Sequence, residues 1–391
     1  MTHRALKVGH IKDEFLPRSE TFIYNQLLGV PDVPPVILDR YAQQNATLFP
    51  VQSHFSPVTA LGAWAGWAER GLLRYFQRSP YLETAIRRQK ITLLHAHFGQ
   101  LGALFAPIAQ RHQVPLLTSF YGKDLSVFAR DPKWAARFDL LWQIGRRFLV
   151  LGPTMQKWLV ELGCPSPKIT ILPLPIDVDL FEYREHTPPP PTEPALLLTV
   201  GRLLPKKGID LLLRALAQVP AGPVPPPHLN IVGDGPQRAR LEHLAHELGL
   251  SDRVHFLGWL APAQVAAQMA AAHVFVLASR SDPTTGETEG SPTVLLEAQA
   301  SGLPVLSTRH ADIPSVVHAG ASGLLVAEND VAALANAVAE IVHSPERWAA
   351  MGRAGRAYVT ATHDIPVVGR QLKQIYISCL HAHTSQPGTP S

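Results

Sequence analysis

Residues 289–297 read Glu289-Gly290-Ser291-Pro292-Thr293-Val294-Leu295-Leu296-Glu297, and this stretch, with the apolar runs on either side of it, decides the fold. Ser291 is a good helix N-cap and Pro292 suits the first helical position, so a helix is predicted to begin here. An apolar run at 274–278 precedes the helix and another at 304–307 follows it. Strand, helix and strand in this order predict a βαβ unit in a parallel sheet.

The same stretch indicates a ligand site. Glu289 is expected in the loop before the helix and Glu297 in its second turn, so the two acids flank a helix N-terminus. Helix N-termini bind anions, because their first amides have no partner within the helix. A ligand with a diphosphate between hydroxyl-rich groups, such as a nucleotide sugar, fits this arrangement. Two glutamates at this spacing also occur by chance, and for the pair alone a glutamate facing solvent is the open alternative.

The alternation of strand and helix continues along both halves of the chain. Apolar runs predict strands in the first half at 92–97, 116–120, 148–152 and 169–173, and in the second half at 196–201, 229–233, 254–258, 274–278, 305–308 and 324–326. Amphipathic segments predict helices at 237–248, 262–272 and 330–343. This pattern predicts an α/β protein with two doubly wound, Rossmann-like domains.

A proline-rich run divides the two halves. Residues 185–194 include four consecutive prolines and predict a stiff linker between a domain of residues 1–184 and a domain of residues 195–364. The helical pattern at 365–380 predicts a crossover helix that packs back onto the first domain. Residues 381–391 are expected to form a disordered tail.

The pair of acids resembles the E-x7-E signature of retaining glycosyltransferases, family 4 in particular. The two-domain pattern is similar to their GT-B fold over nearly the whole chain. The resemblance implies that the two domains face a deep cleft, with the acceptor on the first domain and a nucleotide-sugar donor on the second.

The loop at 201–208, Gly201-Arg202-Leu203-Leu204-Pro205-Lys206-Lys207-Gly208, follows a predicted strand. The resemblance implies that Arg202 and Lys207 hold the donor diphosphate and neutralise the leaving group, so that neither a metal ion nor another cofactor is required. Lys206 is expected to be a bystander. A solvated basic loop is the alternative.

The remaining donor contacts follow from the same resemblance. Glu297 is expected to accept hydrogen bonds from the ribose, and Glu289 is expected to act in catalysis beside the transferred sugar. The other implied donor contacts are Gly233, Gly235, Ser291, Pro292, Thr293 and Val294. For the two glycines a plain turn is an equal alternative.

In the first domain, His95 and His97 share one face of a predicted strand, and no third metal ligand is evident. The resemblance favours His97 as a catalytic residue at the cleft. Tyr121 stands where many family members have histidine, and it is expected to contact the acceptor or sugar. Arg18, Ser19 and Glu20 are further candidates for such contacts, with Ser19 also expected to cap a helix.

The segment from Trp64 to Arg88 combines aromatic and basic side chains. An amphipathic basic helix of this kind can lie on an anionic membrane, but packing of the aromatic residues in the core is the commoner explanation. Residues 1–183 carry 20 Lys and Arg against 14 Asp and Glu, whereas residues 184–391 carry 15 against 17. The basic half shows no nucleic-acid motif, so we expect no nucleic-acid partner.

The N-terminus has no apolar signal core, and the two cysteines, Cys164 and Cys379, have no metal or redox spacing. We therefore expect a cytoplasmic protein, with the inner face of the plasma membrane as a further location.

The function predicted from the sequence is a metal-independent, retaining glycosyltransferase of polysaccharide biosynthesis. It would use a nucleotide-diphosphate sugar, with UDP favoured over GDP, and a glycan or lipid-linked acceptor. The alternatives are a sugar-nucleotide epimerase on the same fold and a non-catalytic protein that binds nucleotide sugars or glycans.

Overall fold

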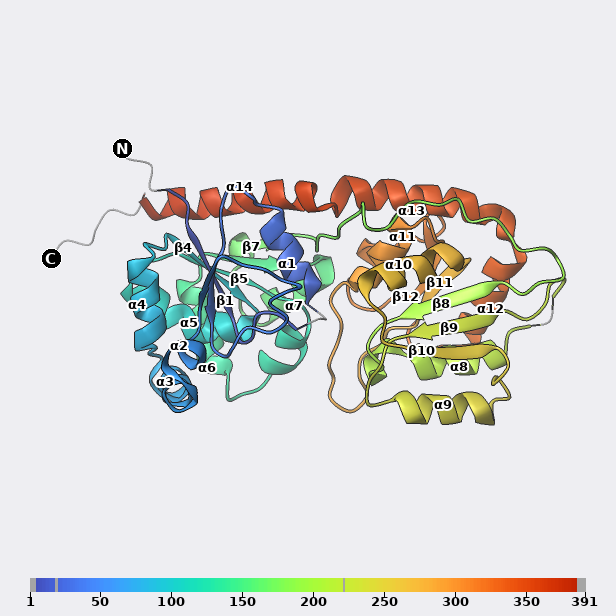
Figure 1. Cartoon of the computed structure of the whole chain (residues 1–391), viewed down its shortest axis with the longest axis horizontal. Helices are drawn as coiled ribbons and strands as arrows, with labels where there is room; N and C mark the ends of the chain where they lie inside the picture. Colours follow the sequence, from blue (N-terminus) through green and yellow to red (C-terminus); the bar gives the residue numbers. More distant parts are fainter. Residues whose placement is uncertain (1–4, 18–19, 221, 385–391) are drawn as a thin grey trace. The chain divides into compact units, whose positions relative to one another are not determined.

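The computed structural model describes residues 5–17, 20–220 and 222–384, and the chain forms two compact units (Figure 1). The first unit comprises Met1–Pro175 and Ile365–Ser391, and the second comprises Ile176–Asp364. Within the described residues no helix is both long enough and apolar enough to cross a membrane.

The first unit contains a seven-stranded parallel sheet. Its strand order is β3-β2-β1-β4-β5-β6-β7, and each neighbouring pair is parallel. The strands are β1 (Val8–Lys12), β2 (Val36–Asp39), β3 (Ser53–Phe55), β4 (Leu93–His97), β5 (Leu116–Ser119), β6 (Arg147–Val150) and β7 (Ile169–Ile171). Because all the strands are parallel, their carboxyl ends all lie at the same edge of the sheet.

Helices cover both faces of this sheet. They are α1 (Thr21–Leu28), α2 (Pro57–Leu61), α3 (Ala63–Phe76), α4 (Pro80–Arg88), α5 (Gly99–Arg111), α6 (Ala135–Ile144), α7 (Pro153–Glu161) and α14 (Ile365–Thr384), with short helical turns η1 (Asp124–Phe128) and η2 (Ser166–Lys168). The predicted crossover helix is confirmed, because α14 packs Val368, Leu372 and Tyr376 against core residues of the first unit that include Val8 and Leu93.

The second unit contains a six-stranded parallel sheet with the order β10-β9-β8-β11-β12-β13. The strands are β8 (Leu196–Val200), β9 (His228–Val232), β10 (Val254–Gly258), β11 (Val274–Leu277), β12 (Val305–Thr308) and β13 (Gly323–Val326). One face is packed against α8 (Ile209–Ala217), α9 (Arg238–Glu247) and α12 (Val331–His343), and the other against α10 (Pro262–Ala271) and α11 (Thr293–Ala300). Helix α13 (Trp348–Thr362) contributes Trp348 and Met351 to the first of these cores and Val359 to the second. Short turns are η3 (Pro205–Lys207), η4 (Ile313–Ser315) and η5 (Pro345–Arg347).

These sheets confirm the predicted α/β class with two parallel, Rossmann-like units. All ten predicted strands are present, but β1, β2 and β3 are missing from the prediction. β1 reads Val-Gly-His-Ile-Lys, and its His10 and Lys12 are buried although their polarity argues against a core strand. The apolar pattern does not reveal β1, because His10 and Lys12 are buried and form polar contacts inside the protein.

The chain passes from the first unit to the second at Pro175–Ile176. The run 185–194, the predicted linker, lies within the second unit, because Ile176, Val178 and Phe181 are already buried in the core of that unit. Helix α14 continues to Thr384, beyond the predicted end at residue 380. The rest of the predicted tail, 385–391, lies outside the described residues.

Candidate functional site

In the second unit, four loops follow the carboxyl ends of β8, β9, β11 and β12, which lie side by side in the sheet. Two glycines allow the loops to approach closely. A Cβ at Gly208 would lie 1.8 Å from the carbonyl oxygen of Ala278, and one at Gly233 would lie 2.0 Å from that of Gly201. Both glycines have positive φ, +62° and +132°. Backbone packing thus places the 201–208 loop against the ends of β9 and β11.

Lys207 and Glu289 form an ion pair at this edge. The Lys207 ammonium nitrogen lies 2.8 Å from Oε1 and 2.9 Å from Oε2 of Glu289, and only 13% and 8% of the two side chains are exposed. Burial alone would raise the pKa of Glu289, but the charges of Lys207 and Lys206 outweigh it, so the pKa is lowered. Glu289 is therefore held as a carboxylate at neutral pH.

Two residues that the sequence analysis does not single out complete the surroundings of Glu289. The Ser279 hydroxyl donates to Glu289 Oε2 at 3.2 Å. The backbone amide of Glu289 donates to Nε2 of His310 at 3.1 Å, and His310 Nδ1 lies 2.9 Å from Glu328 Oε1. This arrangement requires the His310 proton on Nδ1, donated to Glu328. The signal available in the sequence is the position of Ser279 and His310 just after predicted strands.

The two other cations of the loop, Lys206 and Arg202, differ in the contacts that they form. Lys206 donates to Glu287 at 2.7 Å and lies 3.8 Å from Glu289. Arg202 is exposed, and its guanidinium forms no ion pair or hydrogen bond with the described residues. A cation that faces solvent beside a neutralised ion pair is suited to receive an anionic ligand.

The predicted cap of α11 is wrong. The helix begins at Thr293, Pro292 occupies the N-cap with extended backbone angles, and the cap residue contributes no side-chain hydrogen bond. The Ser291 hydroxyl is instead buried and has no hydrogen-bond partner among the described residues. A buried hydroxyl beside the free amides of a helix N-terminus is a suitable donor for a phosphate oxygen. Thr293 and Val294 lie in the first turn.

Glu297 lies on α11 and is half-buried. Removal from water raises the pKa of its carboxyl to about 7, although a hydrogen bond with Thr293 and the charge of Lys207 act in the opposite direction. Lys207 therefore acts electrostatically on both acids of the 289–297 segment. The structure brings together Lys207, Glu289 and Glu297 in the second unit, and their expected contacts with a donor stay predictions.

The glycines of the β9 loop, Gly233 and Gly235, lie against the 201–208 loop. A Cβ on Gly235 would approach the backbone nitrogen of Leu203 to 2.8 Å, and the amide of Leu203 donates to the carbonyl oxygen of Asp234. These contacts explain why both positions require glycine, since a side chain would clash with the 201–208 loop. The expected contact of the two glycines with a nucleotide stays a prediction.

In the first unit, three buried histidines meet. His10 on β1 joins His95 and His97 on β4, and each has a ring nitrogen within 4.8 Å of the others. The structure thus supplies the third histidine that is not evident in the sequence, because β1 and β4 are neighbours in the sheet. Burial lowers the pKa of His10 to about 3 and holds the pKa values of His95 and His97 well below their usual range, so all three are neutral at pH 7.

The ring nitrogens of this histidine cluster form hydrogen bonds with one another and with neighbouring hydroxyl groups. His10 Nδ1 lies 3.1 Å from His97 Nε2, and His97 Nδ1 lies 2.8 Å from the Tyr121 hydroxyl. His95 contacts the hydroxyls of Tyr376 and Ser119 at 2.9 and 2.8 Å. The three rings could hold a transition-metal ion only by exchanging these contacts for metal bonds. The described geometry therefore fits a hydrogen-bonded cluster that orients Tyr121.

Asp124 fixes the loop that carries Tyr121. Its buried carboxylate accepts hydrogen bonds from the amides of Gly99 at 3.0 Å, Tyr121 at 3.0 Å and Gly122 at 2.9 Å. Burial raises the pKa of this carboxyl to about 6, while the amides act in the opposite direction. The residue therefore ties the end of β5 to the start of α5.

A hollow of about 430 Å³ opens at the carboxyl ends of β1, β4 and β5. Lys12 and Glu20 line it and form an ion pair, and the Lys12 ammonium lies 4.5 Å from the centre of the Phe98 ring. Burial raises the pKa of Glu20 against the opposing effect of Lys12. Glu20 is the N-cap of α1. The candidates Arg18 and Ser19 lie outside the described residues.

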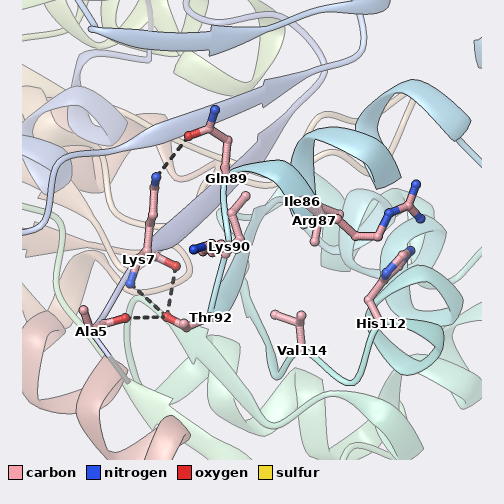
Figure 2. Close-up of a pocket in the computed structure, with 10 residues that line it drawn as sticks. Ala5, Lys7, Ile86, Arg87, Gln89, Lys90, Thr92, His112 and Val114 are labelled. Atoms are coloured by element: carbon pink, nitrogen blue, oxygen red, sulfur yellow. Dashed lines mark hydrogen bonds between the residues drawn. The ribbon is translucent and has the colours of Figure 1, made fainter. Parts of the chain in front are cut away.

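A larger hollow of about 620 Å³ lies at the opposite edge of the same sheet (Figure 2). Lys7 reaches across it to Gln89, at 3.0 Å, and its backbone is tied to Thr92 (Figure 2). The hollow lies at the amino ends of β1 and β4, and its lining includes no carboxylate. Because ligands of such sheets bind at the carboxyl ends of strands, we do not place the chemistry here.

Comparisons with protein families match both halves of the chain. Residues 39–180 match the model described as Glycosyltransferase Family 4, and residues 183–358 match the model described as Glycosyl transferases group 1.

Curated relatives act, by name, in polysaccharide biosynthesis. The putative colanic acid biosynthesis glycosyltransferase WcaL of Escherichia coli is 31% identical over 283 residues, which cover 72% of this chain and 69% of that protein. WcaL of Salmonella typhimurium is 34% identical over 63% of this chain and 60% of its own length. The amylovoran biosynthesis glycosyltransferase AmsK of Erwinia amylovora is 26% identical over 95% of this chain and 99% of its own length.

A solved structure has the same fold. Anabaena HepE in complex with UDP aligns with a TM-score of 0.76 at 18% identity, over 96% of this chain and 100% of that chain. This likeness, with the two parallel-sheet units, supports the GT-B fold.

Proposed function

Because the chain belongs to glycosyltransferase family 4, we propose that it transfers a sugar from a nucleotide-diphosphate sugar to a hydroxyl of a glycan or lipid-linked acceptor in polysaccharide biosynthesis. We propose further that the anomeric configuration is retained and that no metal ion is required. A lipid-linked acceptor would bring the enzyme to the surface of an anionic membrane.

The observation that carries the proposal is the ion pair of Lys207 with Glu289, the first of the two acids of the 289–297 segment. Lys207 contacts Glu289 directly and acts on the charge of Glu297. A donor diphosphate would meet Lys207, the unengaged Arg202 and the first amides of α11. The Ser291 hydroxyl supplies a further donor. Two cationic side chains and a helix N-terminus supply positive charge for the departing diphosphate without a metal ion.

The proposed reaction needs no protein side chain as a base. The acceptor hydroxyl attacks the anomeric carbon on the face from which the diphosphate leaves. A carbon–oxygen bond forms as the bond from the anomeric carbon to the diphosphate breaks, and a diphosphate oxygen takes the acceptor proton. The Glu289 carboxylate would favour the positive charge that develops at the anomeric carbon. Glu297 would accept hydrogen bonds from the ribose hydroxyls.

We propose UDP rather than GDP as the nucleotide. The support is the UDP bound by the structural neighbour from Anabaena, and some curated relatives are instead named as GDP-mannose-dependent. A thermal-shift panel of nucleotide sugars would rank the donors, because a ligand that binds the folded state raises its apparent stability.

The deciding experiment incubates the purified protein and the selected donor with and without acceptor glycans, with and without EDTA. The expected result is a glycosylated product with the donor's anomeric configuration by NMR, formed equally in EDTA. An inverted centre would contradict retention, and loss of activity in EDTA would contradict metal independence. Interconversion of donor sugars without acceptor would indicate an epimerase. Binding without any reaction would indicate a non-catalytic protein.

A further inference from the structure

Helix α3 of the first unit exposes a face of aromatic side chains. Trp64, Trp67 and Tyr75 are 88%, 67% and 74% exposed, and they recur at the spacing of one helix face. The opposite face is buried through Gly66, Glu69 and Leu73. The structure therefore excludes the core packing that the sequence analysis leaves open for these aromatic residues. Trp and Tyr in this number are uncommon on a face that stays in water.

The charge around this face has one sign. Between residues 57 and 81 the sequence has three arginines, Arg70, Arg74 and Arg78, and a single acid, Glu69. Glu69 is buried and accepts hydrogen bonds from the Ser79 hydroxyl at 2.6 Å and the Tyr81 amide at 2.9 Å. The only acid of the segment thus points inward. Arg78 forms an ion pair with the buried Glu83 at 3.0 Å, so Arg70 and Arg74 supply the positive charge beside the exposed rings.

The arginines lie beside aromatic rings. The Arg70 guanidinium lies 4.7 Å from the centre of the Tyr41 ring, and that of Arg74 lies 6.0 Å from the Tyr75 ring. Aromatic side chains with flanking guanidinium groups match the interface of a bilayer, where rings reside at the depth of the headgroups and guanidinium groups bind phosphates. Helix α3 has 14 residues, or roughly 21 Å at 1.5 Å per residue, which suits a helix that lies along a surface.

We propose that α3 docks the protein on an anionic phospholipid surface, with Trp64, Trp67 and Tyr75 inserted among the headgroups and Arg70 and Arg74 on lipid phosphates. The occupant is a lipid surface rather than a second copy of the chain, because the flanking charges complement anionic headgroups and would repel an identical face. The inference goes beyond the transferase assignment, because docking needs neither donor nor acceptor.

The test measures co-sedimentation of the full chain with phosphatidylcholine vesicles that contain or lack phosphatidylglycerol. The variant Trp64→Ser/Trp67→Ser removes the inserting rings from exposed positions, and Trp259→Ser removes a tryptophan that is 53% exposed on the second unit. We expect the wild type and Trp259→Ser to bind only the anionic vesicles, and to bind less at high salt. The double variant should bind the anionic vesicles roughly tenfold more weakly.

Absence of wild-type binding to anionic vesicles, or equal binding by the double variant, would overturn the proposal. So would a wild-type dimer in size-exclusion chromatography that the double variant converts to monomer, because a second copy would then cover α3. A thermal unfolding curve establishes that each variant is folded. UDP binding by calorimetry separates a failure of docking from a failure of the transferase assignment.

Discussion

Glu297→Gln is expected to stabilise the second unit at pH 8 far more than at pH 5. In the folded protein the pKa of Glu297 is about 7, against 4.5 for the ordinary carboxyl. Below pH 4.5 the group is protonated in both states, so its raised pKa has no effect on stability. As the pH rises from 4.5 to 7 the unfolded chain ionises first, and unfolding becomes more favourable. From about pH 8 upward the cost is nearly constant.

The magnitude follows from these two pKa values. The cost in the free energy of unfolding is about 0.8 kcal/mol at pH 5 and about 3.3 kcal/mol at pH 8. Partial solvent access of the side chain reduces the difference to about 2 kcal/mol. The glutamine variant never ionises, so its stability relative to the wild type should increase by this amount between the two pH values.

Urea unfolding at both pH values, followed by circular dichroism, measures this change. Glu242→Gln on α9 controls for the removal of one carboxylate from an exposed position in the same unit. A wild-type-to-variant difference that is equal at pH 5 and pH 8, or larger at pH 5, would refute the reasoning. The expected result would mean that Glu297 lowers stability at the pH at which its carboxylate is available to a ribose diol.

Three further predictions concern single contacts. Lys207→Met should weaken UDP binding by about 10- to 150-fold in calorimetry, because a charge-assisted contact contributes roughly 1.5–3 kcal/mol, and unchanged affinity would contradict its assignment to the diphosphate. Gly233→Ala should lower the free energy of unfolding by about 3 kcal/mol or more, or prevent folding, because its Cβ would lie 2.0 Å from a carbonyl oxygen at a φ of +132°. A urea midpoint equal to that of the wild type would disprove this. Tyr376→Phe should lower the free energy of unfolding by about 1–2 kcal/mol, because it deletes the 2.9 Å contact with His95 inside the buried cluster. A variant as stable as the wild type would show that this contact contributes nothing to stability.

Every strand of the second unit could be predicted from the sequence, but helix α13 and the start of the unit at Ile176 were not. Each of its strands is an apolar run followed by a turn, so periodicity places the strand ends and the loops that carry Lys207 and Glu289. The direct ion pair between these residues could not be predicted, because it depends on how closely the backbone approaches at Gly208. The cap of α11 was also beyond local reasoning, since Ser291 turns into a buried site instead of toward the helix.

The first unit was harder to predict because its buried surface is partly polar. His10 and Lys12 interrupt the apolar pattern of β1, and each is satisfied by a side chain far along the chain or across a loop. The meeting of His10 with His97 follows from strand order, which no local pattern reports. The exposure of Trp64 and Trp67 likewise depends on tertiary packing, because the same helical spacing would suit a buried face.

The return of α14 to the first unit affects how the chain folds during synthesis. The amino-terminal sheet is translated first, but Val368, Leu372 and Tyr376, which cover its core, emerge from the ribosome only after the entire second unit. Until then the nascent sheet has an uncovered apolar face, and the His95 ring lacks its Tyr376 partner. The second unit is continuous in sequence and can complete its core earlier, so the half of the protein that is made first is the half that matures last.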